Sequence, residues 1–228
     1  MIRALARRWF TLALCAAGFL LPACAKEPAA PKPIPGDNWV VGANYNVLAR
    51  PQPADAPAGK VAVVEFFWYG CPHCAAIDPM IQTWNAKKAG YIQFSRTHIV
   101  WGPVHAQHAK LYYTLLALDR LDLHPKVFEE IHQNHDLLAA QDETQARSMQ
   151  QSFLEKNGVS KKDFDAAYDS MSVQVNVQKA RDDTQRFAIE NVPTIVVNGT
   201  YVTNVAMAGS PAQLLRLIDY LAAREKHN

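Results

Sequence analysis

Two cysteines separated by two residues are the feature of the sequence most suited to chemistry. The chain has four cysteines, and two of them lie in an N-terminal segment of targeting type. Cys71 and Cys74 remain for the folded part, in the run Cys71-Pro72-His73-Cys74. A disulfide across so short a loop adds little stability, because loop-closure stabilisation grows with loop length. We therefore expect this pair to serve redox chemistry or metal binding.

The residues around the pair predict a strand followed by a helix. Residues 61–68 form a continuous β-prone run, which is typical of a strand buried on both faces. A glycine ends the run, and apolar residues at helical spacing then predict a helix that begins near Cys71. Pro72 suits the first turn of that helix, and Pro79 should kink it. A strand, a turn and CxxC at a helix N-terminus are the arrangement of a thioredoxin-like redox site.

This placement predicts different roles for the two cysteines. The free N–H groups and partial positive charge of a helix N-terminus favour a thiolate at Cys71, and His73 can add positive charge. A stabilised thiolate makes the disulfide more oxidising. We expect Cys71 to be the exposed nucleophile, and Cys74, one turn further in, to be buried and to resolve the mixed disulfide.

Metal binding is the alternative. His105 and His108 form a second short pair, and zinc sites combine such pairs. However, 30 residues separate Cys74 from His105, far more than in a small zinc finger. Both histidines also lie in a predicted helix over residues 104–121. We therefore favour the redox interpretation and expect no metal.

A second candidate site lies near the C-terminus. Residues 191–202 predict a proline, a strand, an Asn-Gly turn and a second strand, which together form a hairpin. Pro193 could simply start a strand in the trans form. In thioredoxin-like proteins, however, a cis-proline loop abuts the CxxC. We therefore expect a cis Val192–Pro193 bond beside Cys71, where an extended substrate would bind.

These motifs resemble the DsbA family of bacterial periplasmic thiol:disulfide oxidoreductases, in the thioredoxin superfamily. The resemblance is carried by residues 65–74, Val192-Pro193-Thr194 and residues 197–201, and it extends over about residues 39–225. It implies an α/β, thioredoxin-like fold with an inserted helical domain. Residues 37–103 and 191–228 would form the thioredoxin-like domain. Residues 104–190, which show helical periodicity and no convincing strand, would form the insertion.

The resemblance also implies function. Such a protein donates its Cys71–Cys74 disulfide to reduced, newly exported proteins and is reoxidised by a quinone-linked membrane partner of the DsbB type. It would act as a monomer without a cofactor. The expected site consists of catalytic and substrate-binding residues: Cys71, Cys74, His73, Pro72 and Glu65 for catalysis, and Val192 and Pro193 for the substrate. A disulfide isomerase or reductase could use the same site, although those usually need dimerisation or a reducing partner. A metal-binding lipoprotein is the lesser alternative.

Glu65 corresponds to the buried acid of that family. A lone carboxylate within an apolar strand is costly unless it is paired or protonated. Here it could relay a proton to or from Cys74. The alternative is a glutamate that faces solvent on an edge strand, but the Val and Phe residues on both sides of Glu65 disfavour that placement.

The N-terminal segment predicts export. Residues 1–25 carry three arginines and no acid, followed by an uncharged apolar stretch and a small-residue cleavage site, as in a signal peptide. Residues 26–36 contain four prolines and should form an extended linker. Export would place the protein in the periplasm. Leu21-Pro22-Ala23-Cys24 also resembles a lipoprotein signal, in which Cys24 would carry a lipid anchor.

The composition is that of a globular protein. The 228 residues are 49% hydrophobic and 19% charged, which excludes low-complexity and wholly disordered classes. The formal net charge of +2 owes its excess to the arginines of the targeting segment, so the remaining chain is close to neutral. We therefore expect no nucleic-acid partner.

Overall fold

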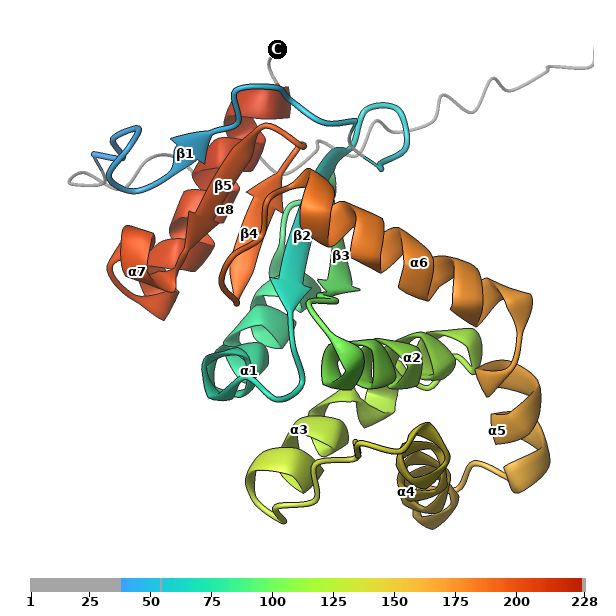
Figure 1. Cartoon of the computed structure of the whole chain (residues 1–228). Helices are drawn as coiled ribbons and strands as arrows, with labels where there is room; N and C mark the ends of the chain where they lie inside the picture. The colour runs from blue at the N-terminus through green and yellow to red at the C-terminus, as the bar shows by residue number, and fades with distance from the viewer. Residues whose placement is uncertain (1–37, 54, 227–228) are drawn as a thin grey trace, which may run out of the picture.

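A five-stranded mixed sheet supports the redox motif (Figure 1). The computed structural model describes residues 38–53 and 55–226, so the predicted signal peptide, the linker and Cys24 lie outside the described residues. The strands follow the order β1-β5-β4-β2-β3, in which β3 is parallel to β2 and the other neighbours are antiparallel. Their bounds are β1 Asn46–Val47, β2 Val61–Phe67, β3 Ile92–His98, β4 Thr194–Val197 and β5 Tyr201–Asn204.

The predicted strand before the cysteines is β2, which has a sheet neighbour on both sides. Side chains alternate between the two faces of a strand. Val63 packs on one face against α1 and α8, whereas Phe66 packs on the other against Phe187. Glu65 shares the face of Val63, so it points towards α1, the helix that begins with the redox motif.

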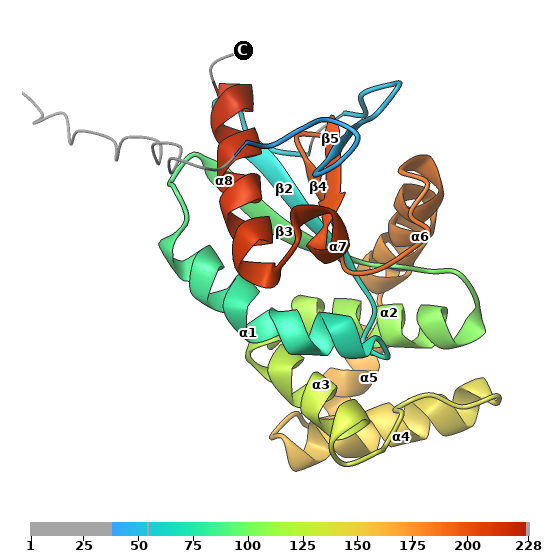
Figure 2. The same ribbon diagram turned by 90° about the vertical axis from the view of Figure 1, so that its left-hand side faces the viewer.

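Helices account for most of the remaining chain (Figures 1 and 2). Their bounds are α1 Pro72–Lys87, α2 Pro103–Ala117, α3 His124–His132, α4 Glu143–Lys156, α5 Lys161–Tyr168, α6 Met171–Arg186, α7 Val205–Ala208 and α8 Pro211–Lys226, with a 3-10 turn at Leu121–Leu123. The helix α1 continues through Pro79 and bends along its length (Figure 2). Within the residues that the structure describes, no helix is long and apolar enough to cross a membrane.

The helices α2 to α6 follow one another between β3 and β4, and no strand interrupts them, as predicted. The helix expected over residues 104–121 is shorter, since α2 ends at Ala117 and a 3-10 turn follows. The strand β1 and the helix α7 were not predicted, because both are too short to show periodicity. The division into a thioredoxin-like domain and a helical insertion at residues 104–190 stays a prediction.

The C-terminal hairpin confirms the prediction from its turn residues. Asn198 and Gly199 both have positive φ, at 49° and 63°, and Thr200 N–H donates to the Val197 carbonyl over 3.0 Å. Two central residues of positive φ make a type I′ turn, for which Asn-Gly is the preferred pair. This turn pairs β5 with β4, and the pairing of β4 with β2 fixes the position of the proline loop that precedes β4.

Candidate active site

Cys71 lies at the start of α1, as predicted. Its backbone is extended, with φ −89° and ψ 116°, and its sulfur accepts a hydrogen bond from the Cys74 N–H at 3.4 Å. Pro72 occupies the first turn, where no N–H is needed. The indole of Trp68 folds over Gly70 so closely that a Cβ on Gly70 would collide with the ring. Close packing of the Trp68 ring therefore favours glycine at this position.

The two cysteines differ in exposure in the predicted order, but Cys71 is less exposed than we expected. Cys71 is 6% exposed and Cys74 is 0% exposed, and both are free thiols in this structure. The reason is the loop before β4. The Cys71 thiol donates to the Val192 carbonyl oxygen over 3.5 Å, so this loop covers much of the sulfur.

The pKa of Cys71 is lowered to about 6. The largest cause is a hydrogen bond with the Cys74 side chain, and the backbone N–H groups of Cys74 and His73 add to it, while burial opposes it. The positive charge of His73 is the smallest of these contributions. The backbone N–H groups of the helix N-terminus therefore lower the pKa of Cys71 more than the charge of His73 does.

The pKa of Cys74 moves in the opposite direction. Burial raises it most, followed by the hydrogen bond with Cys71 and the negative charge of that thiolate. Two identical side chains three residues apart thus differ in protonation at neutral pH, with a thiolate at Cys71 and a thiol at Cys74. This difference is what a nucleophile and a resolving cysteine require.

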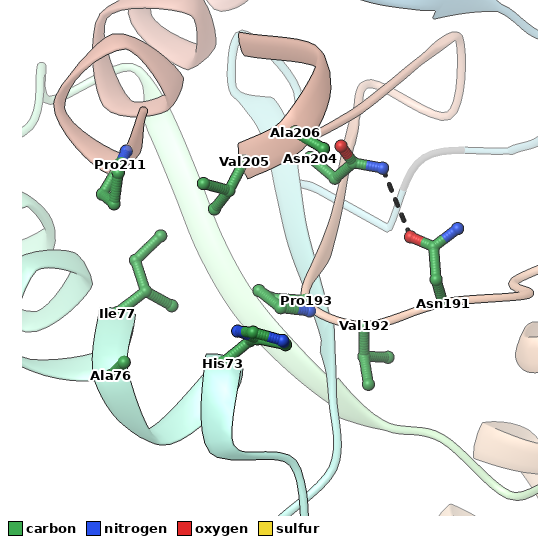
Figure 3. Close-up of a pocket in the computed structure, with 10 residues that line it drawn as sticks. All are labelled: His73, Ala76, Ile77, Asn191, Val192, Pro193, Asn204, Val205, Ala206 and Pro211. Carbon is green, nitrogen blue, oxygen red and sulfur yellow. Dashed lines mark hydrogen bonds between the residues drawn. The ribbon is translucent and has the colours of Figure 1, made fainter. Parts of the chain in front are cut away.

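The proline loop lies beside the cysteines, as predicted. The Val192–Pro193 peptide bond is cis, and the Val192 carbonyl contacts Cys71. A cavity of about 520 Å³ opens next to the loop (Figure 3). Its lining is mainly apolar and comes from α1, the proline loop and the region of α7: His73, Ala76, Ile77, Asn191, Val192, Pro193, Asn204, Val205, Ala206 and Pro211. An extended peptide that reaches Cys71 could place a side chain here.

Glu65 is buried, as predicted, and it is paired. The register of β2 and β3 sets it opposite Arg96, whose Nε donates to Glu65 Oε2 over 2.7 Å. Burial raises the pKa of Glu65, while the Arg96 charge opposes that shift. The guanidinium of Arg96 also donates to Asp78 Oδ1 over 2.7 Å, so one cation serves two buried carboxylates.

The sequence analysis missed the second carboxylate and its partner His124. Asp78 lies on the buried side of α1, and His124 Nε2 from α3 lies 3.3 Å from its Oδ1. Burial raises the pKa of Asp78, but contact with His124 and the charge of Arg96 outweigh it and hold that pKa below its ordinary value. An acid between Ile77 and Ile81 was the available signal. We call Glu65, Asp78, Arg96 and His124 the buried charge cluster.

Two further histidines hold the residues just before Cys71. The Trp68 indole N–H donates to His108 Nδ1 over 2.9 Å, and His108 Nε2 lies 2.7 Å from the Leu137 carbonyl oxygen. The ring of His105 stacks on Trp68 at 4.6 Å between centroids. Both nitrogens of His108 are thus engaged, which leaves none for a metal. Over residues 38–53 and 55–226, no group of three potential metal ligands occurs.

A CxxC pair at a helix N-terminus, facing a cis-proline loop on a mixed sheet, defines a thioredoxin-type dithiol site. Comparison with known proteins agrees, since residues 56–220 match the thioredoxin family. The thiol:disulfide interchange protein DsbA of Pseudomonas aeruginosa is 36% identical over 83% of this chain and 87% of its own. That of Burkholderia cepacia is 40% identical over 79% of this chain and 82% of its own.

Solved structures give the same result. The crystal structure of Pseudomonas aeruginosa DsbA superposes with a TM-score of 0.77 at 35% identity, covering 84% of this chain and 97% of that one. The oxidoreductase DsbA from Xylella fastidiosa gives 0.74 at 32% identity, covering 83% and 98%. The chain belongs to the DsbA family of thiol:disulfide interchange proteins.

Proposed function

We propose that this oxidoreductase donates the Cys71–Cys74 disulfide to reduced, exported proteins through a mixed disulfide at Cys71. A substrate thiolate attacks the Cys71 sulfur, the Cys71–Cys74 bond breaks, and the Cys74 sulfur leaves and takes up a proton. A second substrate thiolate then attacks its partner sulfur in the mixed disulfide and releases the Cys71 thiolate. The substrate is oxidised by two electrons and the protein is reduced by two.

The observation that carries this proposal is the lowered pKa of Cys71, about 6. A thiol of low pKa leaves readily, so the mixed disulfide resolves towards release of Cys71. The same stabilised thiolate favours the reduced protein, which makes the disulfide a strong oxidant. The raised pKa of Cys74 fits a sulfur that is protonated as soon as it leaves.

We assign supporting roles to the remaining site residues. Pro72 and His73 shape the first turn of α1, and His73 adds a small positive charge. Val192 and Pro193 border the cavity beside Cys71 and would contact the substrate backbone. The buried carboxylate of Glu65 interacts electrostatically with both Cys71 and Cys74, which supports a role in exchanging a proton with Cys74.

We infer that the protein works in the periplasm, as its DsbA homologues do, after removal of residues 1–25. Acylation of Cys24 is the alternative, and the mass of the mature N-terminus distinguishes the two. We further propose that the protein acts as a monomer and that a DsbB-like membrane oxidase restores the disulfide. Both redox equivalents reside on two sulfur atoms, so no cofactor enters the step.

The redox equilibrium of the Cys71/Cys74 pair with glutathione tests the proposal. We expect glutathione to reduce the pair almost completely at ratios that leave a structural disulfide intact. In the Cys74→Ser variant the Cys71 thiolate can still attack a disulfide-bonded substrate and displace one of its sulfurs, so mixed disulfides through Cys71 should accumulate because Cys74 is no longer there to resolve them. A pair that stays oxidised in excess reduced glutathione would contradict an oxidase.

A further inference from the structure

The cavity beside Cys71 has one wall that consists of a very short helix. The helix α7 has only four residues, Val205–Ala208, and two of its residues line the cavity (Figure 3). A helix of this length has little stability of its own, because nucleation of a helix is unfavourable. Its position must therefore come from contacts with its surroundings.

Asn204 supplies one such contact and leads to another. Its Oδ1 accepts a hydrogen bond from the Met207 N–H at 2.9 Å, which caps α7. Its Nδ2 donates to Asn191 Oδ1 over 3.2 Å, the bond drawn in Figure 3. The residue that caps the helix therefore also connects the helix to the loop before Pro193.

Asn191 is itself held on the opposite side. The Thr194 hydroxyl donates to the Asn191 carbonyl at 2.7 Å and reaches its Oδ1 at 3.1 Å. Thr194 and Asn204 are the last paired residues of β4 and β5 at this end of the sheet. The contact between the two asparagines therefore joins the segment that precedes β4 to the last paired residue of β5.

We propose that Asn191 is a positioning residue that fixes α7 against the proline loop and thereby sets substrate specificity. The inference rests on the proposed function, since it concerns how a peptide docks beside Cys71. A fixed wall keeps the apolar cavity preformed, and a preformed cavity favours an apolar side chain next to the substrate cysteine. When the contact is lost, α7 can shift, and the preference for a large apolar side chain should weaken.

Two dithiol peptides test this, identical except that each cysteine is flanked by Phe in one and by Ala in the other. Wild-type protein should oxidise the Phe peptide with the higher kcat/KM. In Asn191→Ala that preference should fall by about 3- to 10-fold, through a higher KM for the Phe peptide with little change in kcat. A tenfold change corresponds to about 1.4 kcal/mol, comparable with one neutral hydrogen bond.

Three variants separate the hydrogen bond from other effects. Asn191→Asp keeps an acceptor for Asn204 and should restore the preference. Asn191→Leu keeps the volume without the acceptor and should behave like Asn191→Ala. Asn134→Ala removes an exposed asparagine whose side chain donates to Glu130 on α3, away from the cavity, and should leave both peptides unaffected.

The outcomes distinguish this inference from the proposed function. An unchanged preference in folded Asn191→Ala, or restoration by Leu but not by Asp, would overturn the role of Asn191 while the oxidase stands. Failure of the wild-type protein to oxidise either peptide would instead overturn the proposed function.

Discussion

The first turn of α1 and the buried charge cluster both hold negative charge near Cys71, but they stabilise it with different groups. In the turn, the Cys74 side chain and then backbone N–H groups stabilise a thiolate that has no ionic partner apart from the small contribution of His73. In the cluster, two carboxylates depend on one guanidinium and one histidine. Backbone donors are part of any helix N-terminus, whereas a buried charge must find side-chain partners. Changes in the turn should therefore affect chemistry, and changes in the cluster should affect stability.

The largest expected effect is at the sulfur atoms. Cys71→Ser should abolish oxidation of a reduced substrate, because without Cys71 the remaining Cys74 cannot form the Cys71–Cys74 disulfide that the substrate thiolate attacks. Cys74→Ser should form mixed disulfides and fail to release them. Both should unfold near the wild-type temperature when compared with the reduced protein. Full activity in Cys71→Ser would contradict the assigned roles.

Removal of Arg96 should instead lower the stability of the fold. Arg96→Met leaves Glu65 and Asp78 buried without their shared cation, which we expect to cost about 3–5 kcal/mol of unfolding free energy in urea. Arg147 provides a matched control, since it also pairs with two carboxylates, Asp165 and Asp169, but at a more exposed site. Arg147→Met should cost at most about 1 kcal/mol. Equal losses in the two variants would remove the distinction between buried and exposed clusters.

The pH dependence of stability should separate the two buried acids. The lowered pKa of Asp78 stabilises the fold above the ordinary carboxyl range, and this contribution is lost as pH falls through that pKa. The raised pKa of Glu65 has the reverse sign, so its contribution is lost as pH rises above about 4.3. Urea titrations of the oxidised protein as a function of pH should show both effects, with opposite signs.

Two substitutions show which acid causes each pH-dependent loss of stability. Asp78→Asn should flatten the loss of stability on the acid side, and Glu65→Gln should flatten the loss on the other side. If Asp78→Asn instead changes the stability at higher pH, or Glu65→Gln changes it on the acid side, the direction assigned to that residue's pKa shift is wrong.

The smallest effect should come from His73. His73→Ala removes a charge but leaves the backbone N–H groups in place, so the pKa of Cys71 should rise by less than about 1 unit. The glutathione equilibrium should move slightly towards the disulfide. A rise of two units or more would show that the histidine, and not the helix terminus, controls the thiolate.

The same contrast explains what the sequence could predict. The turn is local, so a strand, a glycine, CxxC and a proline within about twenty residues were enough to predict the placement of Cys71 and Cys74. The Asn-Gly turn likewise predicted the hairpin from its own residues. The charge cluster could not be predicted in full, because its four residues come from β2, α1, β3 and α3. Only Glu65 stood out, as a charge in an apolar strand.

The exposure of Cys71 was predicted too high, and the surroundings of α7 were not predicted, for the same nonlocal reason. Cys71 is covered by the Val192 loop from the other end of the chain, so it is less exposed than a helix terminus alone would suggest. The proposed contribution of Asn191 to the position of α7 comes from a residue with no distinctive sequence context. Contacts between distant segments decide both features, and periodicity within a segment cannot reveal them.

A pH titration of Cys71 in the reduced wild-type protein tests the central claim most directly. The rate of alkylation by iodoacetamide should follow the thiolate fraction of Cys71, since the raised pKa of Cys74 keeps that thiol unreactive. We expect the alkylation rate to reach half its maximum at about pH 6. A midpoint near the ordinary thiol value of about 8.5 would contradict it.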